Sequence, residues 1–102
     1  MKLCEAARVI RSKNAGPFLL TFDVFFANSE LFDRAYETQR FNAESAARAF
    51  NVQPSEILGF KYFRFANAVK FSMRRSIASG GPADSDVYGA QQHAPLLDLE
   101  AF

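Results

Sequence analysis

The chain contains no tryptophan, one histidine and one cysteine among its 102 residues. The single Cys4 cannot form an internal disulfide, and its isolation fits a reducing compartment. No apolar run approaches the ~20 residues that a membrane-spanning helix needs, and the N-terminus has no apolar core of a signal peptide. We therefore expect a cytoplasmic protein that does not associate with membranes.

Basic residues are missing from the last quarter of the chain. Residues 76–102 hold four acids and no base, a net charge of −4, whereas residues 1–75 hold all twelve bases and seven acids, a net charge of +5. The overall charge of +1 gives no reason to expect nucleic-acid or membrane binding. The split predicts that the acidic tail lies across the basic body, or that two copies or two subunits pair through it.

Phenylalanine is the residue in excess, with twelve copies. A single domain of this length buries roughly two-thirds of its unfolded surface, so hiding twelve phenyl rings is difficult. The excess indicates either a protein–protein contact or unusually complete burial within a monomer. We expect one domain, made of an α/β body over residues 1–79 and an acidic segment over residues 80–102 that begins at Gly80-Gly81-Pro82.

Apolar spacing in the first quarter predicts a helix followed by a strand. An i, i+4, i+7 pattern predicts a helix over residues 2–11, ended by turn residues at 12–17. Residues 18–26 are apolar on nearly both sides, which is typical of a central strand covered on both faces. Asp23 is the exception within that strand.

The remainder of the body predicts two helices and a hairpin. Asn28 or Ser29 is a good N-cap for a helix ending near Gln39, and Asn42 for a helix ending near Asn51. Residues 56–65 and 68–75 predict two strands joined at Ala66-Asn67, with a basic cluster of Lys61, Arg64, Lys70, Arg74 and Arg75. The expected fold is α+β: a small, mainly antiparallel sheet with helices packed on one face and an extended C-terminal tail.

The stretch from Asp84 to Pro95 concentrates hydrogen-bonding side chains. His93 is the one side chain whose ordinary pKa lies near neutrality, so it is the candidate general acid or base, with Tyr88 or Asp86 orienting it or relaying a proton. The neighbouring amides of Gln91 and Gln92 are candidates for substrate binding. The alternative is a histidine that only satisfies hydrogen bonds at a surface.

A metal site is the weaker hypothesis for the same stretch. Asp84, Asp86 and His93 would give two carboxylates and one imidazole, a set that suits a divalent ion. However, Asp-Ser-Asp after Gly-Gly-Pro is explained by turn chemistry, in which the side chains bond nearby backbone amides. We expect no metal and no other cofactor.

A second polar group, Arg11, Ser12, Lys13 and Asn14, falls at the predicted helix–strand junction. Basic and amide groups there would hold a carboxylate or phosphate, although a solvated turn is the simpler explanation on these residues alone. A helix-turn-helix over residues 46–57 is disfavoured, because its second helix would run into residues that alternate like a strand. We therefore expect no nucleic-acid partner.

Three segments carry a resemblance to a known family: Arg8–Phe18, Leu20–Asp23 and above all Asp84–Asp98. They resemble a family of short proteins without an assigned activity. Its members accompany acyclic terpene utilisation A (AtuA)-type proteins, either as a neighbouring chain or fused to their C-terminus. The resemblance implies a stoichiometric subunit with an AtuA-type large subunit as partner. It also implies a role with branched or unsaturated carboxylic acids or their coenzyme A (CoA) esters, where hydratase and lyase steps are common.

Together these features predict a small accessory subunit that completes the active site of a larger enzyme. Residues 11–14 would bind a substrate carboxylate or thioester carbonyl, and Tyr88 or His93 would transfer a proton, with Asp86 orienting one of them. The alternative is a non-catalytic module that stabilises or oligomerises the large partner. A homo-oligomer is a further alternative.

Overall fold

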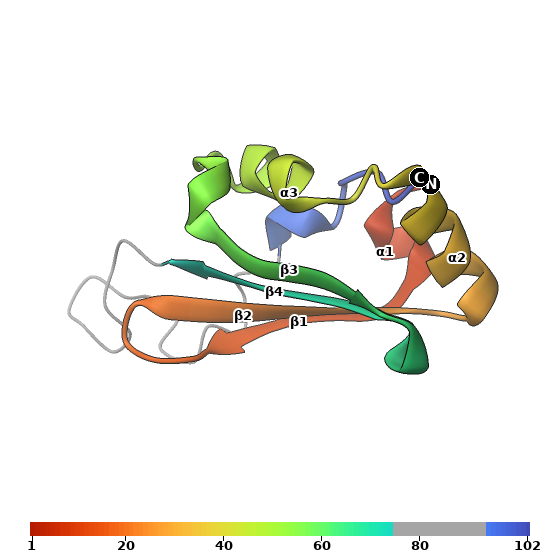
Figure 1. Cartoon of the computed structure of the whole chain (residues 1–102), viewed down its shortest axis with the longest axis horizontal. Coiled ribbons are helices and arrows are strands. Elements are labelled where there is room, and N and C mark those ends of the chain that lie inside the picture. The colour runs from red at the N-terminus through yellow and green to blue at the C-terminus, as the bar shows by residue number, and fades with distance from the viewer. Residues whose placement is uncertain (75–93) are drawn as a thin grey trace.

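The computed structural model describes residues 1–74 and 94–102. These residues form a four-stranded antiparallel sheet in the order β1-β2-β4-β3, with the helices packed on one face (Figure 1), so the predicted α+β class is confirmed. None of the described helices is long and apolar enough to cross a membrane. In chain order the elements are α1 (Leu3–Ala6), β1 (Ala7–Asn14), β2 (Leu19–Phe26), α2 (Ser29–Thr38), α3 (Ala43–Phe50), η1 (Pro54–Glu56), β3 (Ile57–Phe63), η2 (Arg64–Ala66), β4 (Ala68–Arg74) and η3 (Ala94–Leu96).

The central strand is β2, as predicted, and it pairs with β1 on one side and β4 on the other. Leu20, Phe22, Val24 and Phe26 alternate along it and are buried beneath the helices. Among the described residues, the expectation that layers cover both faces is wrong, because α1, α2 and α3 all lie on one side of the sheet (Figure 1). On the opposite face of β2, Asp23 is buried, whereas Thr21 and Phe25 are half-buried.

Aromatic packing joins the sheet to α3. The Phe22 ring stacks on Phe71 of β4 at 4.8 Å between centroids and contacts Phe50 of α3 at 5.0 Å. Phe60 of β3 stacks on the other side of this group, 5.5 Å from Phe71. Most of the phenylalanine excess is therefore core. Among the described residues, Phe65 is completely exposed, Phe18 about half exposed and Phe63 more than one-third exposed.

The predicted helices α2 and α3 are confirmed together with their caps. The side chain of Asn28 accepts from the backbone N–H of Leu31 at 2.9 Å, and that of Asn42 accepts from Ser45 at 2.8 Å. Each helix ends at a residue in the left-handed conformation, Gln39 and Asn51 respectively. Side-chain caps that satisfy free backbone N–H groups explain why these starts were predictable.

The predicted helix over residues 2–11 is wrong beyond its first turn. Only Leu3–Ala6 is helical, and the chain then continues as β1, which pairs with β2 from Ala7 to Asn14. A helix of about ten residues is marginal by itself. Pairing with an apolar inner strand gives β1 inter-strand hydrogen bonds along one side, so the tertiary context determines the structure here.

The predicted hairpin of β3 and β4 is confirmed, with Asn67 in the left-handed conformation at its turn. A bulge interrupts β3 between Leu58 and Lys61, where Gly59 has a φ of 62°. The extra residue reverses the alternation of side chains. As a result Phe60 and Tyr62 face the helices, whereas Lys61 faces the other side.

The last described segment closes against the start of the chain. The backbone N–H of Leu3 donates to Leu99 at 2.8 Å, and Leu96 is fully buried. Lys2 Nζ lies 3.5 Å from Asp98 Oδ1. The described part of the acidic tail therefore lies across the N-terminal part of the body, the first of the arrangements considered from the charge distribution.

Tyr62 connects β3 to the chain between α2 and α3. Its hydroxyl donates to the carbonyl oxygen of Phe41 at 2.6 Å and lies 3.3 Å from that of Ala35. Burial raises the pKa of Tyr62 from 10.0 to about 12. The neutral hydroxyl is therefore part of the folded structure.

Replacing Gly59 tests the bulge. No atom lies within 4 Å of an added Cβ, so the effect of Gly59→Ala comes from backbone strain at positive φ alone. We expect the free energy of unfolding to fall by about 1 kcal/mol. Gly59→Asn should lose less, because asparagine tolerates this conformation. Urea unfolding measures the free energy of unfolding of both variants. If Gly59→Ala is as stable as the wild type, residue 59 does not have the left-handed conformation that the bulge requires.

Replacing Tyr62 tests the hydroxyl contact and its pH dependence. Tyr62→Phe should lower the free energy of unfolding by about 1 kcal/mol at neutral pH. The folded-state pKa is above the unfolded one, so the contribution of the hydroxyl is present below pH 10 and is lost as the pH rises through about 12. The difference between wild type and variant, measured by urea unfolding, should therefore shrink toward a pH of about 11. A difference that grows with pH would refute this assignment.

Candidate functional site

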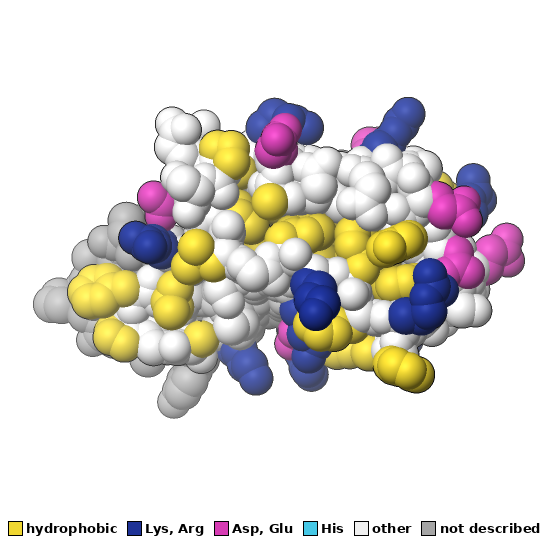
Figure 2. Space-filling model, in the orientation of Figure 1, with side chains coloured by type: hydrophobic (Ala, Val, Ile, Leu, Met, Phe, Trp, Pro, Cys, Tyr) yellow, Lys and Arg dark blue, Asp and Glu magenta, His cyan; other side chains and the backbone are white. Residues whose placement is uncertain are grey.

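In the part of the chain that the structure describes, one face of the sheet carries no helical layer (Figure 1). We call it the open face. Strand register places on it the side chains that alternate with the buried ones: Val9, Arg11 and Lys13 of β1, Thr21, Asp23 and Phe25 of β2, Ala68, Lys70 and Ser72 of β4, and Leu58, Lys61 and Phe63 of β3. Figure 2, which views the sheet from its edge, shows basic and hydrophobic side chains lying together along the lower, sheet side.

A row of charged residues crosses the middle of the open face. Lys61, Lys70, Asp23 and Arg11 are directly opposite one another on successive strands. Asp23 Oδ2 accepts from Arg11 Nε at 3.0 Å, and Asp23 Oδ1 lies 3.7 Å from Lys70 Nζ. Only 9% of the Asp23 side chain is exposed, against 57% for Arg11 and 47% for Lys70. The carboxylate is thus enclosed while both cations reach solvent.

A hollow of about 320 Å³ lies beside this row. The charged and hydroxyl side chains that line it are Arg11, Lys13, Thr21, Asp23, Lys70 and Ser72, and Leu58 and Phe63 add apolar surface. Three cations and one carboxylate give the hollow a positive charge. Cations and hydroxyls together are donors suited to a carboxylate or phosphate.

The end of the open face near η2 is aromatic. Phe25 lies under three cations, with the guanidinium carbons of Arg8 and Arg11 at 5.5 and 5.1 Å from its centroid and Lys70 Nζ at 5.9 Å. Phe63 lies in the same row as Phe25, since both are opposite Ala68, and it is 38% exposed. Phe65 of η2 is completely exposed. An exposed aromatic cluster is unusual on a solvated sheet face and is typical of a contact surface.

Strand pairing divides the predicted anion-binding group of residues 11–14 between two faces. Arg11 and Lys13 lie on the open face and line the hollow. Ser12 is buried opposite Phe22, and Asn14 lies opposite Leu20, both on the helix-covered side. The prediction placed the four residues at a helix–strand junction, whereas in a strand consecutive side chains point to opposite faces.

The other predicted site residues, Asp84, Asp86, Tyr88, Gln91, Gln92 and His93, lie outside the described residues. Within residues 1–74 and 94–102 no group of three or more metal-ligating side chains occurs. Sequence reasoning noted Asp23 and the basic hairpin but did not connect them to Arg11. It missed Thr21 and Ser72 entirely, because only the register of the strands brings these residues together.

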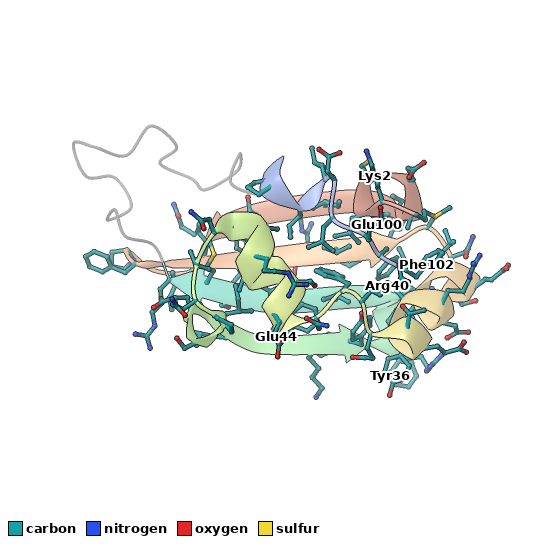
Figure 3. All side chains as sticks on the ribbon, turned by 90° about the horizontal axis from the view of Figure 1, so that it is seen from above. Lys2, Tyr36, Arg40, Glu44, Glu100 and Phe102 are labelled. Carbon is teal, nitrogen blue, oxygen red and sulfur yellow. The ribbon has the colours of Figure 1, made fainter. Side chains whose placement is uncertain are left out.

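A second hollow, of about 590 Å³, lies on the helix side between α3 and the C-terminal segment. Arg40 and Arg48 line it together with Asp98 and Glu100. Figure 3 shows Arg40 on the α3 side and Glu100 beside Lys2 on the other. Its charges balance, and Asp98 already pairs with Lys2, so the hollow on the open face is the better candidate for an anionic ligand.

Paired substitutions at neighbouring residues test the assignment of faces. Ser12→Leu forces a larger side chain against the buried side of the sheet, and we expect a loss of about 1–3 kcal/mol in the free energy of unfolding. Lys13→Leu, one residue later on the open face, should change it by less than about 0.5 kcal/mol. Chemical denaturation measures the free energy of unfolding of both variants. Similar losses would mean that Ser12 and Lys13 do not lie on opposite faces of the sheet as the register of β1 requires.

Neither a curated protein nor a solved structure matches this chain. A family model does match, over residues 3–100, and it is described as a domain of unknown function, DUF4387. That range takes in β1, β2, β4 and β3, and therefore the whole of the open face. The match carries no activity and no partner. The chain belongs to the DUF4387 family.

Proposed function

We propose that this protein is a small accessory subunit of an AtuA-type enzyme complex, and that it docks on its large partner through the open face. There it would complete an active site for a branched or unsaturated carboxylic acid or its CoA ester, in a hydratase- or lyase-like step. The open face is the observation that carries the proposal, since it combines exposed aromatic rings with a positively charged hollow. The AtuA-type partner and the substrate class come from the sequence resemblance.

The aromatic end of the open face supports docking. A solvated face of an antiparallel sheet normally carries polar side chains. Here Val9 and Phe63 are each 38% exposed, and Phe65 projects completely into solvent. Aromatic residues of this kind supply much of the binding energy in protein interfaces.

Charge favours a partner with an acidic surface over a second copy. The open face carries Arg11, Lys13, Lys61 and Lys70 against the single, enclosed Asp23. A symmetric dimer through this face would place cations opposite cations, which is unfavourable. An acidic surface on the large subunit would be complementary.

Docking would also convert the open hollow into an enclosed site. Arg11 and Lys13 line the hollow, and both reach it from β1. Covered by a partner, their charges would act in a less polar medium and hold a substrate carboxylate or polarise a thioester carbonyl more strongly. The proton-transfer roles proposed for Tyr88 and His93, with Asp86 orienting them, are supported by the sequence alone.

Co-expression with an AtuA-type large chain tests the docking surface. Phe65→Ser, and separately Phe63→Ser, should weaken association at least roughly tenfold, because each removes an exposed aromatic contact. Leu97→Ser is the matched control, since Leu97 is 37% exposed on the C-terminal segment and outside the open face. Association measured by light scattering should be unchanged by the control. Absence of any complex with the wild-type chain would refute the subunit proposal.

Turnover of the assembled complex separates catalysis from a purely structural role. If His93→Ala or Tyr88→Phe abolishes turnover while the complex stays intact, the small chain completes the active site. If turnover persists with both variants and with Lys13→Gln, the protein is a non-catalytic module that stabilises or oligomerises its partner.

A further inference from the structure

We propose that the hollow on the open face is a binding site, formed by this chain alone, for a small ligand with a carboxylate or phosphate next to an apolar group. We further propose that Asp23 is an internal competitor for that anion. The inference deepens the substrate class given under the proposed function, and its test needs no partner.

The structure already contains a carboxylate held by two of the cations. Asp23 places one oxygen 3.0 Å from Arg11 Nε and the other 3.7 Å from Lys70 Nζ. Arg11 and Lys70 therefore stand close enough together to share one anion. Both are about half exposed, so a ligand in the hollow can approach them from solvent.

Lys13 supplies the charge that Asp23 does not offset. It lines the same hollow, and no ion pair to it is found among residues 1–74 and 94–102. In the row of Lys13, strand register places Thr21 and Ser72 next to one another. The Thr21 hydroxyl donates to the backbone carbonyl oxygen of Lys13 at 3.4 Å, a long contact that a ligand oxygen can replace. The Ser72 hydroxyl is a second neutral donor that would complete the coordination of an oxyanion.

The apolar part of the ligand is indicated by the third strand. Leu58 lies opposite Ser72 and Phe63 opposite Ala68, and both line the hollow. A ligand with its anion between β1 and β4 would lay a short apolar group against these side chains. A volume of about 320 Å³ fits a small molecule better than a polymer.

Titration of the isolated full-length chain with four probes tests the site, using backbone amide shifts in NMR as the readout. Hexanoate and hexyl phosphate should each bind saturably, with shifts confined to β1, β2, β4 and β3. Inorganic phosphate should bind more weakly, and hexanol should not bind. The stronger of the first two probes identifies the anion as carboxylate or phosphate. Failure of both to saturate would overturn the proposal.

Two variants separate a defined site from a general positive field. Lys13→Gln should weaken hexanoate binding by about fivefold or more, because it removes a charged donor. Lys61→Gln is the matched control, since Lys61 lies in the same charged row but does not line the hollow, and its effect should stay within about twofold. Equal losses in the two variants would refute the site, as would a single-stranded oligonucleotide that binds through the same residues more tightly than hexanoate.

Asp23→Asn supplies a readout that a merely structural role would not give. Asparagine keeps an acceptor for Arg11 but removes the competing charge, so anion affinity should rise by about threefold or more. Unchanged or weaker binding by a folded variant would overturn the role of Asp23, and Lys13→Gln tests the site independently. If this binding is found but no large partner associates, the docking proposal fails alone. If the partner associates but no probe binds, the anion site fails alone.

Discussion

The alternation of side chains along β2 is the constraint on which both the core and the open face depend. Phe22 points toward the helices and is enclosed by Phe71 and Phe50, which ties the central strand to β4 and α3. Its neighbour Asp23 necessarily points the other way, between Arg11 and Lys70. A shift of one residue would expose the core and bury a carboxylate among phenyl rings, so the register is strongly determined.

The open face owes its composition to features on three strands. β1 contributes the cations Arg11 and Lys13, two residues apart, and β4 contributes Lys70 and Ser72 at the matching level. In β3 the bulge at Gly59 turns Lys61 outward and the aromatic Phe60 inward. Because of this one glycine in a left-handed conformation, the charged side chain in the second half of β3 faces the open face and the aromatic one faces the core.

Local signals in the sequence predicted much of the fold. Asn28 and Asn42 predicted the starts of two helices, because their side chains accept hydrogen bonds from backbone N–H groups three residues later. Such a contact depends only on the local sequence. The end of the first helix was not predictable in this way, since β1 forms only by pairing with β2. The site was predicted in part for the same reason: Arg11 and Lys13 were identified, whereas Thr21, Lys70 and Ser72 join them only through strand register.

The strand order divides the sheet into two local hairpins that are joined by one long-range pairing. β1–β2 and β3–β4 each close over a short connection, at residues 15–18 and 64–67. The pairing of β2 with β4 joins residues as distant as Leu19 and Arg74, so the entropy of loop closure falls mainly on this one step. Because α2 and α3 lie within that loop, their helical turns shorten the flexible chain that must be closed. The middle of the sheet is therefore the part that limits how fast the molecule can assemble.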